Sequence, residues 1–449
     1  MAKKPSSRYV CSNCGAVASS WSGKCLQCGE WNTLQEELAA DVVAGSVAAG
    51  RVLRPQSVGQ SVKSDRRRLA SGTPEIDAVF GGGLVAGSVN LLAGQPGIGK
   101  STLLLQLAYA VAAKAPVLYV SGEESAHQIG LRAKRLGTLR SDLQLATSNS
   151  ADDIAATIAA GKYQLVVVDS IQTVSCTAVA SAAGSIPQIT NSTRMLTLAA
   201  KQSNTALLLV GHVTKEGSIA GPKVLEHVVD VVLQLEGDRY GGFKVLRAVK
   251  NRFGSTNEAG IFEMVEEGLQ PVDNPSAALL AERQASDGSV VLAALEGTRP
   301  VLVEVQALVN RTSYGYPKRT ASGFDLNRLN LLVAMLERRT KLKLAEHDIY
   351  INIVGGIQIR EPAADLAVCL AIGSAAKGLQ LKKDAVVFGE VGLSGEIRHV
   401  PYAEKRLAEA KKLGFQGAIG PAQKSAKKLA GLYAVKDVRA ALNQFLEKD

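Results

Sequence analysis

Residues 88–110 read SVNLLAGQPGIGKSTLLLQLAYA, and this stretch decides the fold of the central part of the chain. A short strand-like run leads into a glycine-rich loop, and a helical run follows. The loop carries the pattern G-x-x-x-x-G-K-S in the strand–loop–helix context that phosphate binding requires. Its glycines let backbone N–H groups surround phosphates, and the helix N-terminus adds partial positive charge. The sequence therefore predicts a nucleotide site formed by Gly94, Gln95, Pro96, Gly97, Ile98, Gly99, Lys100, Ser101 and Thr102.

The side chains of this loop, together with one aspartate, predict a site for ATP and Mg²⁺. We expect Lys100 to reach the β- and γ-phosphates and the Ser101 hydroxyl to ligate Mg²⁺. The apolar run 163–169 is typical of a buried strand, and it ends in Asp169. We expect this carboxylate to hold Mg²⁺ through water.

Two further strand ends carry candidate catalytic residues. Glu123 follows the run 116–121, where a carboxylate can orient the attacking water; Glu124 is the second choice, and an ordinary acid at a helix start is the alternative. His212 follows the run 206–211 and is predicted to sense the γ-phosphate. A lone histidine is often structural, and that alternative stays open.

The spacing of apolar runs predicts the fold class. Strands are expected at 88–93, 116–121, 163–169, 206–211, 229–235 and 244–250, with helices between them. Such alternation predicts an α/β fold with a mostly parallel sheet covered on both faces. Active groups gather at the carboxyl ends of such strands, where Lys100, Glu123, Asp169 and His212 all fall.

The first thirty residues contain two C-x-x-C pairs, each followed by glycine. Two such knuckles can direct four thiolates at one tetrahedral Zn²⁺, and a segment this short needs metal to fold. The predicted ligands are Cys11, Cys14, Cys25 and Cys28. Unpaired or disulfide-bonded cysteines are the alternative. The isolated Cys176 and Cys369 are interpreted as core thiols.

Three further features lie near the N-terminus. Two of them have alternative interpretations, and the third is interpreted only as a linker. Trp21 and Trp31 flank the second knuckle and either pack over the metal loop or form a surface for base stacking or partner docking. Residues 35–65 lack periodicity and are interpreted as a linker. The run Arg66-Arg67-Arg68 is either a solvated charge cluster or a phosphate contact.

The composition limits the classes of protein. Lys and Arg number 51 against 41 Asp and Glu, and this net charge of +10 suits a polyanion such as nucleic acid. The sequence contains no apolar stretch long enough to cross a membrane and no apolar signal core, so we expect a cytoplasmic protein without membrane contacts.

With these motifs in order, the chain resembles the bacterial RadA (Sms) family of DNA recombination and repair ATPases. The resemblance rests on the four-cysteine knuckles, the loop GQPGIGKST and the pentapeptide Lys250-Asn251-Arg252-Phe253-Gly254, and it covers essentially the whole chain. It implies a RecA-like ATPase core and a homo-hexameric ring that moves on single-stranded and branched DNA. It also implies work beside the RecA recombinase, extending strand-exchange branches.

The resemblance also implies roles for the pentapeptide and for two loops. Lys250 and Arg252 are expected to reach the γ-phosphate bound by a neighbouring subunit; the alternative is a solvated turn. Residues 174–193 are expected to face DNA through backbone amides and hydroxyls, or to form a plain flexible loop. Lys215 and Lys223, in the next loop, could contact phosphates.

The part after residue 285 resembles the proteolytic domain of Lon, an α+β domain with a Ser–Lys dyad. Ala363 stands in place of the serine, and by the same spacing Glu404 falls where the lysine belongs, with Lys405 one residue off. We therefore expect no peptidase activity and a role in oligomerisation. Basic groups could bind duplex DNA there: Lys382, Lys383, Lys405, Arg406, Lys411, Lys412, Lys424, Lys427 and Lys428.

The predicted domains are a zinc module at 1–34, a linker at 35–65, an ATPase domain at 66–272 and a Lon-like domain at 273–449. The predicted function is a DNA-dependent ATPase motor. The alternative is a nucleotide-gated assembly platform that recruits repair proteins without translocating.

Overall fold

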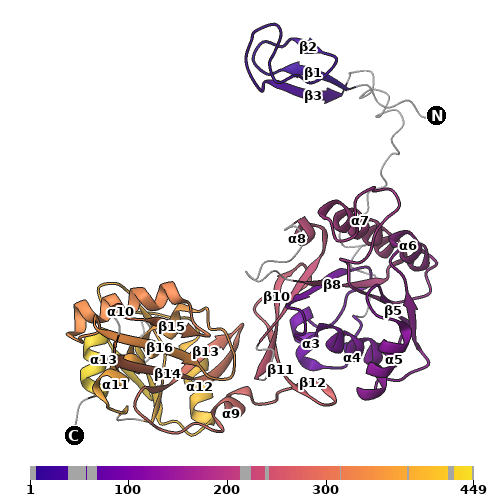
Figure 1. Ribbon diagram of the computed structural model, residues 1–449. Helices are drawn as coiled ribbons and strands as arrows, with labels where there is room; N and C mark the ends of the chain where they lie inside the picture. Colours follow the sequence, from indigo (N-terminus) through magenta and orange to yellow (C-terminus); the bar gives the residue numbers. More distant parts are fainter. Residues whose placement is uncertain are drawn as a thin grey trace. The chain divides into compact units, whose positions relative to one another are not determined.

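The structure is a computed structural model that describes residues 7–38, 57, 68–212, 224–237, 242–313, 315–381, 384–422 and 429–446. The chain divides into two compact units, Met1–Asp65 and Arg66–Asp449. In Figure 1 the first unit is drawn in indigo, and the second contains two separate sheets with their helices.

The first unit is a three-stranded antiparallel sheet in the order β2–β1–β3. Its strands are β1 (Ser7–Cys11), β2 (Val17–Ala18) and β3 (Leu34–Leu38). The apolar cluster is small: Cys11, Cys25 and Leu34, with Tyr9, Ala16 and Ala18 packed against them. The predicted linker start at residue 35 is wrong, because residues 35–38 pair with β1. Of the predicted linker and the basic run after it, residues 39–56 and 58–67 lie outside the described part.

The second unit begins with a nine-stranded sheet in the order β12–β11–β10–β9–β4–β8–β7–β5–β6. The six predicted strands are present as β4, β5, β7, β8, β9 and β10, and strands β4–β9 are mutually parallel. Strands β10, β11 and β12 return antiparallel. The bounds are β4 (Val89–Gly94), β5 (Val117–Ser121), β6 (Leu143–Thr147), β7 (Leu165–Asp169), β8 (Ala206–His212), β9 (Val231–Gly237), β10 (Phe243–Asn251), β11 (Ala259–Val265) and β12 (Gly268–Pro271).

Helices cover both faces of this sheet, as Figure 1 shows. Alternate residues of β7 point to opposite faces: Leu165 and Val167 join one apolar cluster, and Val166 and Val168 join the other. The first cluster includes α3 (Pro74–Phe80), α4 (Lys100–Ala112) and α5 (Ala126–Arg135); the second includes α6 (Ala151–Ala159), α7 (Ile186–Ser203) and α8 (Val224–Val228). Burial on both faces explains why these strands are continuously apolar in the sequence.

The C-terminal part has a seven-stranded mixed sheet in the order β15–β16–β14–β13–β17–β20–β21. One face packs on α10 (Leu326–Thr340), α11 (Asp365–Lys377) and α13 (Val438–Phe445), and the other on α12 (Ala403–Lys412). The remaining bounds are α9 (Pro275–Leu280), β13 (Ser289–Glu296), β14 (Arg299–Arg311), β15 (Arg319–Ser322), β16 (His347–Ile353), η1 (Pro362–Ala364), β17 (Ala385–Val387), β18 (Glu390–Val391), β19 (Ile397–Arg398), β20 (Gly417–Pro421) and β21 (Leu432–Val435).

An ion pair between a fully buried arginine and a partly buried glutamate holds α12 on this second sheet. The guanidinium of Arg406 is 0% exposed and donates to Glu361 Oε1 at 3.0 Å and Oε2 at 2.6 Å. It also donates to the Ala293 carbonyl of β13, while Glu361 accepts from the backbone N–H of Leu295 at 2.6 Å. Both charges therefore have partners on the sheet as well as each other.

Within the described part of the chain, no helix is both long and apolar enough to span a bilayer.

Removing one member of the buried pair should destabilise the C-terminal part strongly. Arg406→Ala leaves the Glu361 carboxylate without its cation, and we expect a loss of about 3–5 kcal/mol in the unfolding free energy. Urea unfolding followed by circular dichroism measures this, with Glu404→Ala as the control from an exposed position of the same helix. An equal loss in both variants would contradict the structural role of the pair.

Candidate nucleotide site and metal centre

The predicted phosphate-binding loop lies between β4 and α4. Gly97 and Gly99 have φ of +78° and +113°, which L side chains rarely adopt. Gly99 is also crowded, because a Cβ there would lie 2.7 Å from the Met264 side chain of β11. Helix α4 begins at Lys100, directly after the loop, so its N-terminal N–H groups face the space that the loop surrounds.

Lys100 is buried beneath this loop. Its ammonium donates to the carbonyls of Gly94 and Gln95, both at 3.0 Å, and lies 3.3 Å from His212 Nδ1. Burial lowers the pKa of Lys100, and the carboxylates of Asp169 and Glu123 partly oppose that shift. The site therefore holds a desolvated cation between backbone oxygens and two acids.

The parallel strands bring the predicted acidic residues and the histidine to the same sheet edge. Gly94 pairs with His212 across β4 and β8, and Ser121 pairs with Asp169 across β5 and β7. Glu123 follows β5, accepts a hydrogen bond from the Ser170 hydroxyl, and lies 3.5 Å from His212 Nε2. The structure thus brings Lys100, Glu123, Asp169 and His212 together.

The two candidate acids after β5 differ in their partners. Glu124 forms an ion pair with Arg132 of α5 at 2.5 Å. Glu123 faces the strand ends at Ser170 and His212. This difference favours Glu123 as the group available to a water near the phosphates.

Sequence reasoning missed two residues at this edge. The Tyr119 hydroxyl donates to Asp169 Oδ2 at 2.6 Å, and burial beside that carboxylate raises the pKa of Tyr119 well above its usual range. Ser170 supplies the hydrogen bond to Glu123. One tyrosine inside an otherwise aliphatic strand was the available signal for Tyr119, because a buried phenol needs a hydrogen-bond partner.

The pentapeptide residues Lys250 and Arg252 lie elsewhere. Strand β10 is antiparallel to β9, and Asn251 pairs with Val231, which pairs with Asn90 near the start of β4. From Asn90 to Gly94 the strand advances roughly 13 Å toward the phosphate-binding loop. Lys250 and Arg252 therefore occupy the opposite sheet edge from the loop of their own chain.

Local contacts orient both cations. A bulge between Ala248 and Lys250 shifts the register of β10. The Lys250 ammonium donates to the carbonyls of Glu226 and Val229, at the end of α8, and partial burial beside Arg252 lowers its pKa. The Arg252 guanidinium donates to Asp230 Oδ1 at 3.0 Å while its side chain stays 52% exposed.

The predicted DNA-facing segment is only partly a loop. Residues 186–193 form the beginning of α7, so the irregular part ends at Ser185. Gln188, on the first turns of α7, binds the loop: its amide oxygen accepts from Cys176 N–H at 2.9 Å, and its nitrogen donates to the Val179 carbonyl at 2.7 Å. Lys215 and Lys223 lie outside the described residues.

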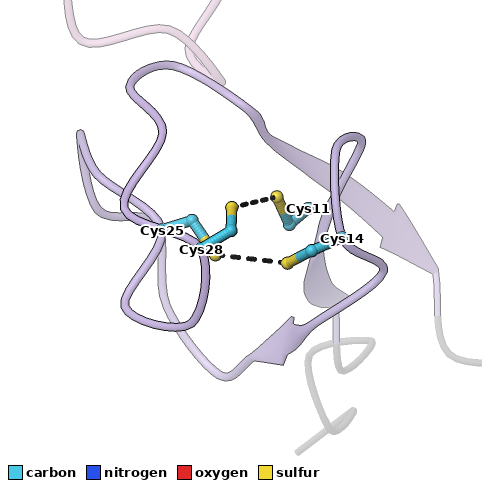
Figure 2. A group of neighbouring side chains, drawn as sticks. All are labelled: Cys11, Cys14, Cys25 and Cys28. Carbon is cyan, nitrogen blue, oxygen red and sulfur yellow. Dashed lines mark hydrogen bonds between the residues drawn. The ribbon is translucent and has the colours of Figure 1, made fainter.

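The four N-terminal cysteines converge, as Figure 2 shows. Their sulfur atoms all lie within 4.8 Å of one another, with 3.7 Å between Cys11 and Cys28 and between Cys14 and Cys25. A tetrahedral Zn²⁺ with Zn–S bonds of about 2.3 Å would separate its sulfur ligands by about 3.8 Å. The donor set and spacing therefore fit a four-thiolate zinc site.

The two knuckles repeat one backbone pattern. Gly15 N–H donates to the Cys11 carbonyl at 2.8 Å, and Gly29 N–H donates to the Cys25 carbonyl at 2.9 Å. Both glycines have positive φ, +73° and +76°. A hydrogen bond with the Thr33 hydroxyl lowers the pKa of Cys11 to about 6, and the backbone amides of Cys28 and Gln27 lower that of Cys25. These two shifts favour the thiolate form that a metal requires. At Cys14 the backbone N–H of Ala16 lowers the pKa, but burial and hydrogen bonds with the other three thiols outweigh it and raise the pKa to about 12, so a bound cation would have to displace that proton.

Both tryptophans are largely exposed. Trp21 is 58% exposed and Trp31 68% exposed, and the Lys24 ammonium lies 5.8 Å from the Trp31 ring centre. The Trp31 ring also lies 3.5 Å from the position that a Cβ on Gly23 would take, so Trp31 combines the packing and the surface interpretations. By contrast, Cys176 and Cys369 are buried, as predicted for core thiols.

The segment around Ala363 also departs from the expectation. Ala363 is buried in η1, but Glu404 is exposed, so it is not the α12 residue that faces this segment. Arg406 is that residue, because its guanidinium binds Glu361 two positions before Ala363. Helical spacing explains the correction: positions 403, 406, 407 and 410 of α12 face inward.

Comparison with known proteins decides the family. The chain is 46% identical to the DNA repair protein RadA of Pseudomonas aeruginosa, over 98% of each chain. It is 47% identical to RadA of Bacillus subtilis, over 93% of each, and 43% identical to RadA of Escherichia coli, over 99% of each. The chain belongs to the RadA family of DNA repair proteins.

Family models match three segments of this RadA family member. An AAA domain matches residues 54–218, and a rubredoxin metal binding domain matches residues 9–36 around the four cysteines. Subunit ChlI of Mg-chelatase matches residues 330–424, in the C-terminal part. Together with the two sheets, these matches confirm the predicted fold class: a zinc-ribbon module, a RecA-like α/β ATPase core and a Lon-like α+β domain.

The metal centre of this RadA family member can be tested directly. Cys28→Ser removes one of four thiolates, so we expect the zinc content to fall from about one ion per chain to a small fraction of that. Inductively coupled plasma mass spectrometry measures the loss, and Cys176→Ser, in the buried core, is the matched control. A full zinc complement in Cys28→Ser would contradict the four-cysteine site.

The different partners of the two acids give a second prediction. If Glu123 orients the attacking water, Glu123→Gln should reduce ATP turnover by about 10²–10⁴-fold while nucleotide binding persists. Glu124→Gln removes only the ion pair with Arg132, so turnover should stay within a fewfold of the parent. Steady-state hydrolysis and fluorescent-nucleotide binding separate the two effects. The opposite ranking would transfer the role to Glu124.

Proposed function

We propose that this chain is a DNA-dependent ATPase whose complete active site forms only between neighbouring subunits of a ring. The observation that carries the proposal is the position of Lys250 and Arg252 at the sheet edge opposite their own phosphate-binding loop. Cations at that edge cannot reach their own nucleotide, but a head-to-tail assembly brings one subunit's edge against the next subunit's loop.

Within this proposal, each residue at the loop edge has a role. The loop amides and Lys100 bind the β- and γ-phosphates, exchanging the contacts of Lys100 with Gly94 and Gln95 for phosphate oxygens. Ser101 and Asp169 hold Mg²⁺, which would neutralise phosphate charge when bound. Tyr119 keeps Asp169 oriented through its hydrogen bond.

Glu123 and His212 then act on the two sides of the γ-phosphate. Glu123, held by Ser170, orients the water and accepts its proton. His212 lies between Lys100 and Glu123: its Nδ1 is 3.3 Å from the Lys100 ammonium and its Nε2 is 3.5 Å from the Glu123 carboxylate. Loss of the γ-phosphate would therefore change the contacts of His212 with both residues. We assign His212 the sensor role.

The neighbouring subunit supplies the remaining charge. Arg252 is half exposed and keeps one nitrogen on Asp230, so its other N–H groups can donate to a phosphate across the interface. Lys250 would first have to leave the carbonyls of Glu226 and Val229. Such cations stabilise charge in the transition state and make hydrolysis depend on assembly.

DNA is the partner that the family supports, since the curated relatives are named DNA repair proteins. The net charge of +10 suits a polyanion. We propose that a homo-hexamer binds single-stranded and branched DNA through the segment 174–185 and through Lys215 and Lys223. It would migrate branches beside RecA. The Zn²⁺ module and its exposed tryptophans would serve partner or DNA contacts.

The C-terminal domain is proposed as a non-cleaving scaffold for oligomerisation. Ala363 offers no oxygen nucleophile. Arg406 cannot replace a lysine base, because a guanidinium stays protonated and this one is bound to Glu361. We place the domain boundary near residue 272, between β12 of the first sheet and α9.

The rival function is a nucleotide-gated platform that recruits repair proteins without moving. It shares the need for Lys100. It does not need single-stranded DNA to accelerate turnover, nor cations that act across an interface.

Steady-state ATP hydrolysis with and without single-stranded DNA tests the choice. We expect DNA to stimulate turnover, and Arg252→Ala to lower the stimulated rate by about 10³-fold with nucleotide binding nearly intact, because only transition-state charge loses its partner. Arg311→Ala, which removes a cation that is 81% exposed, is the control.

Two results would count against the motor. Turnover indifferent to DNA would favour the platform. Full turnover in Arg252→Ala would refute the cross-subunit role of this residue, even if DNA stimulation remained.

A further inference from the structure

Arg68, the last residue of the basic run, lies on three consecutive glycines. Its Cδ is 3.6 Å from the position that a Cβ on Gly82 would take, its Nη1 is 3.5 Å from that of Gly81, and its own Cβ is 3.3 Å from that of Gly83. The arginine is exposed to solvent, and its side chain lies along the turn after α3.

The glycines are required by this close approach. Their φ values are +80°, +107° and +110°, and a Cβ on Gly83 would come within 2.7 Å of the Leu69 carbonyl. A Cβ on Gly81 would lie 2.9 Å from the Cα of Gly254, at the end of the pentapeptide. Two segments that are distant in the sequence, 68–69 and 253–254, therefore both pack against the glycine turn.

The guanidinium joins these segments by hydrogen bonds. Nη2 donates to the Phe253 carbonyl at 2.9 Å, and Nη1 donates to the Phe80 carbonyl at 3.4 Å. Mutual backbone hydrogen bonds between Leu69 and Leu84, at 2.8 and 2.9 Å, hold the arginine's own backbone. Arg68 therefore links the carboxyl end of α3 to the residue that follows Arg252.

A second side chain supports the same segment from inside. Asn251 donates to the Val79 carbonyl at 3.2 Å and accepts from the Phe253 N–H at 2.9 Å. Phe253 itself packs against the core beneath α3 and α4. The turn that carries Arg252 is consequently attached to α3 on both sides, with Arg68 as the outer attachment.

We propose that Arg68 is a positioning residue for the cross-subunit cation Arg252. This rests on the proposed function, because it gives Arg68 a role only if Arg252 acts on a neighbour's nucleotide. The planar fork of arginine can serve two carbonyls at once, whereas a lysine offers a single point of attachment. The residue is thereby assigned to the hydrolysis machinery of the next subunit, although it touches neither nucleotide nor DNA.

The first experiment measures DNA-free ATP hydrolysis by full-length Arg68→Ala and Arg68→Lys. A displaced cation should lower kcat by roughly 10- to 100-fold in Arg68→Ala. The KM for ATP should stay within about twofold, because the variant's own loop is intact. Arg68→Lys should recover only a minor part of kcat. Arg311→Ala controls for the loss of one exposed positive charge.

The second experiment mixes subunits, which separates a positioning defect from a folding defect. Arg68→Ala has an intact phosphate-binding loop, and Lys100→Ala has an intact Arg252 turn. In a randomly mixed ring, some interfaces place the intact phosphate-binding loop of an Arg68→Ala subunit against the intact Arg252 turn of a Lys100→Ala subunit. Such an interface regains a complete site. The mixture should recover roughly a quarter of the parent rate, which is about threefold above Arg68→Ala alone if that variant keeps a tenth of the rate and about 25-fold above it if it keeps a hundredth.

A parallel mixture of Arg252→Ala with Lys100→Ala distinguishes the possible failures. If this mixture recovers activity and the Arg68→Ala mixture does not, the positioning role is wrong and the cross-subunit site stands. If neither recovers, the proposed function itself fails. Unchanged DNA-free kcat in Arg68→Ala overturns the positioning role, and a salt-dependent loss of DNA affinity beside that unchanged kcat would identify Arg68 as a phosphate contact instead.

Discussion

Strand direction in the first sheet is the constraint on which the active chemistry depends. Hydrogen bonding in register makes β4, β5, β7 and β8 parallel, so their carboxyl ends meet at one edge. Lys100, Glu123, Asp169 and His212 become neighbours for that reason alone, although more than a hundred residues separate the first from the last. The antiparallel return of β10 sends Lys250 and Arg252 to the other edge. In the proposed ring, the two halves of one reaction centre would therefore come from opposite edges of neighbouring sheets.

Buried polar groups at the loop edge are satisfied by one another. Lys100 is desolvated, which lowers its pKa, yet it keeps two carbonyl partners and two nearby carboxylates. Asp169 has the Tyr119 hydroxyl as a partner. Such groups are costly to bury without partners, so their mutual contacts offset the cost of burying them. The same rule applies in the C-terminal sheet, where the charges of Arg406 and Glu361 compensate each other.

The zinc module and the C-terminal domain show opposite solutions to stability. The module buries only a few apolar side chains, so a metal held by its four sulfur atoms would supply stability that a core supplies elsewhere. The C-terminal sheet buries apolar residues on both faces, so its stability comes from packing.

The sequence by itself determined the local units. The phosphate-binding loop, five of the six parallel strands and the cysteine knuckles follow from short patterns whose physical meaning is local: glycine dihedrals, apolar periodicity and ligand spacing. Neither the parallel strand β6 nor the antiparallel direction of β10 was predicted from the sequence. Only the tertiary structure decided contacts between distant segments. It paired Glu124 with Arg132 and left Glu123 at the site, turned Arg406 rather than Glu404 toward Ala363, and exposed the two tryptophans. It also showed that Arg68, one member of a charge run in the sequence, donates a hydrogen bond to the Phe253 carbonyl. These outcomes depend on which surfaces the packed sheet and helices bring within hydrogen-bonding distance, and no local pattern encodes that.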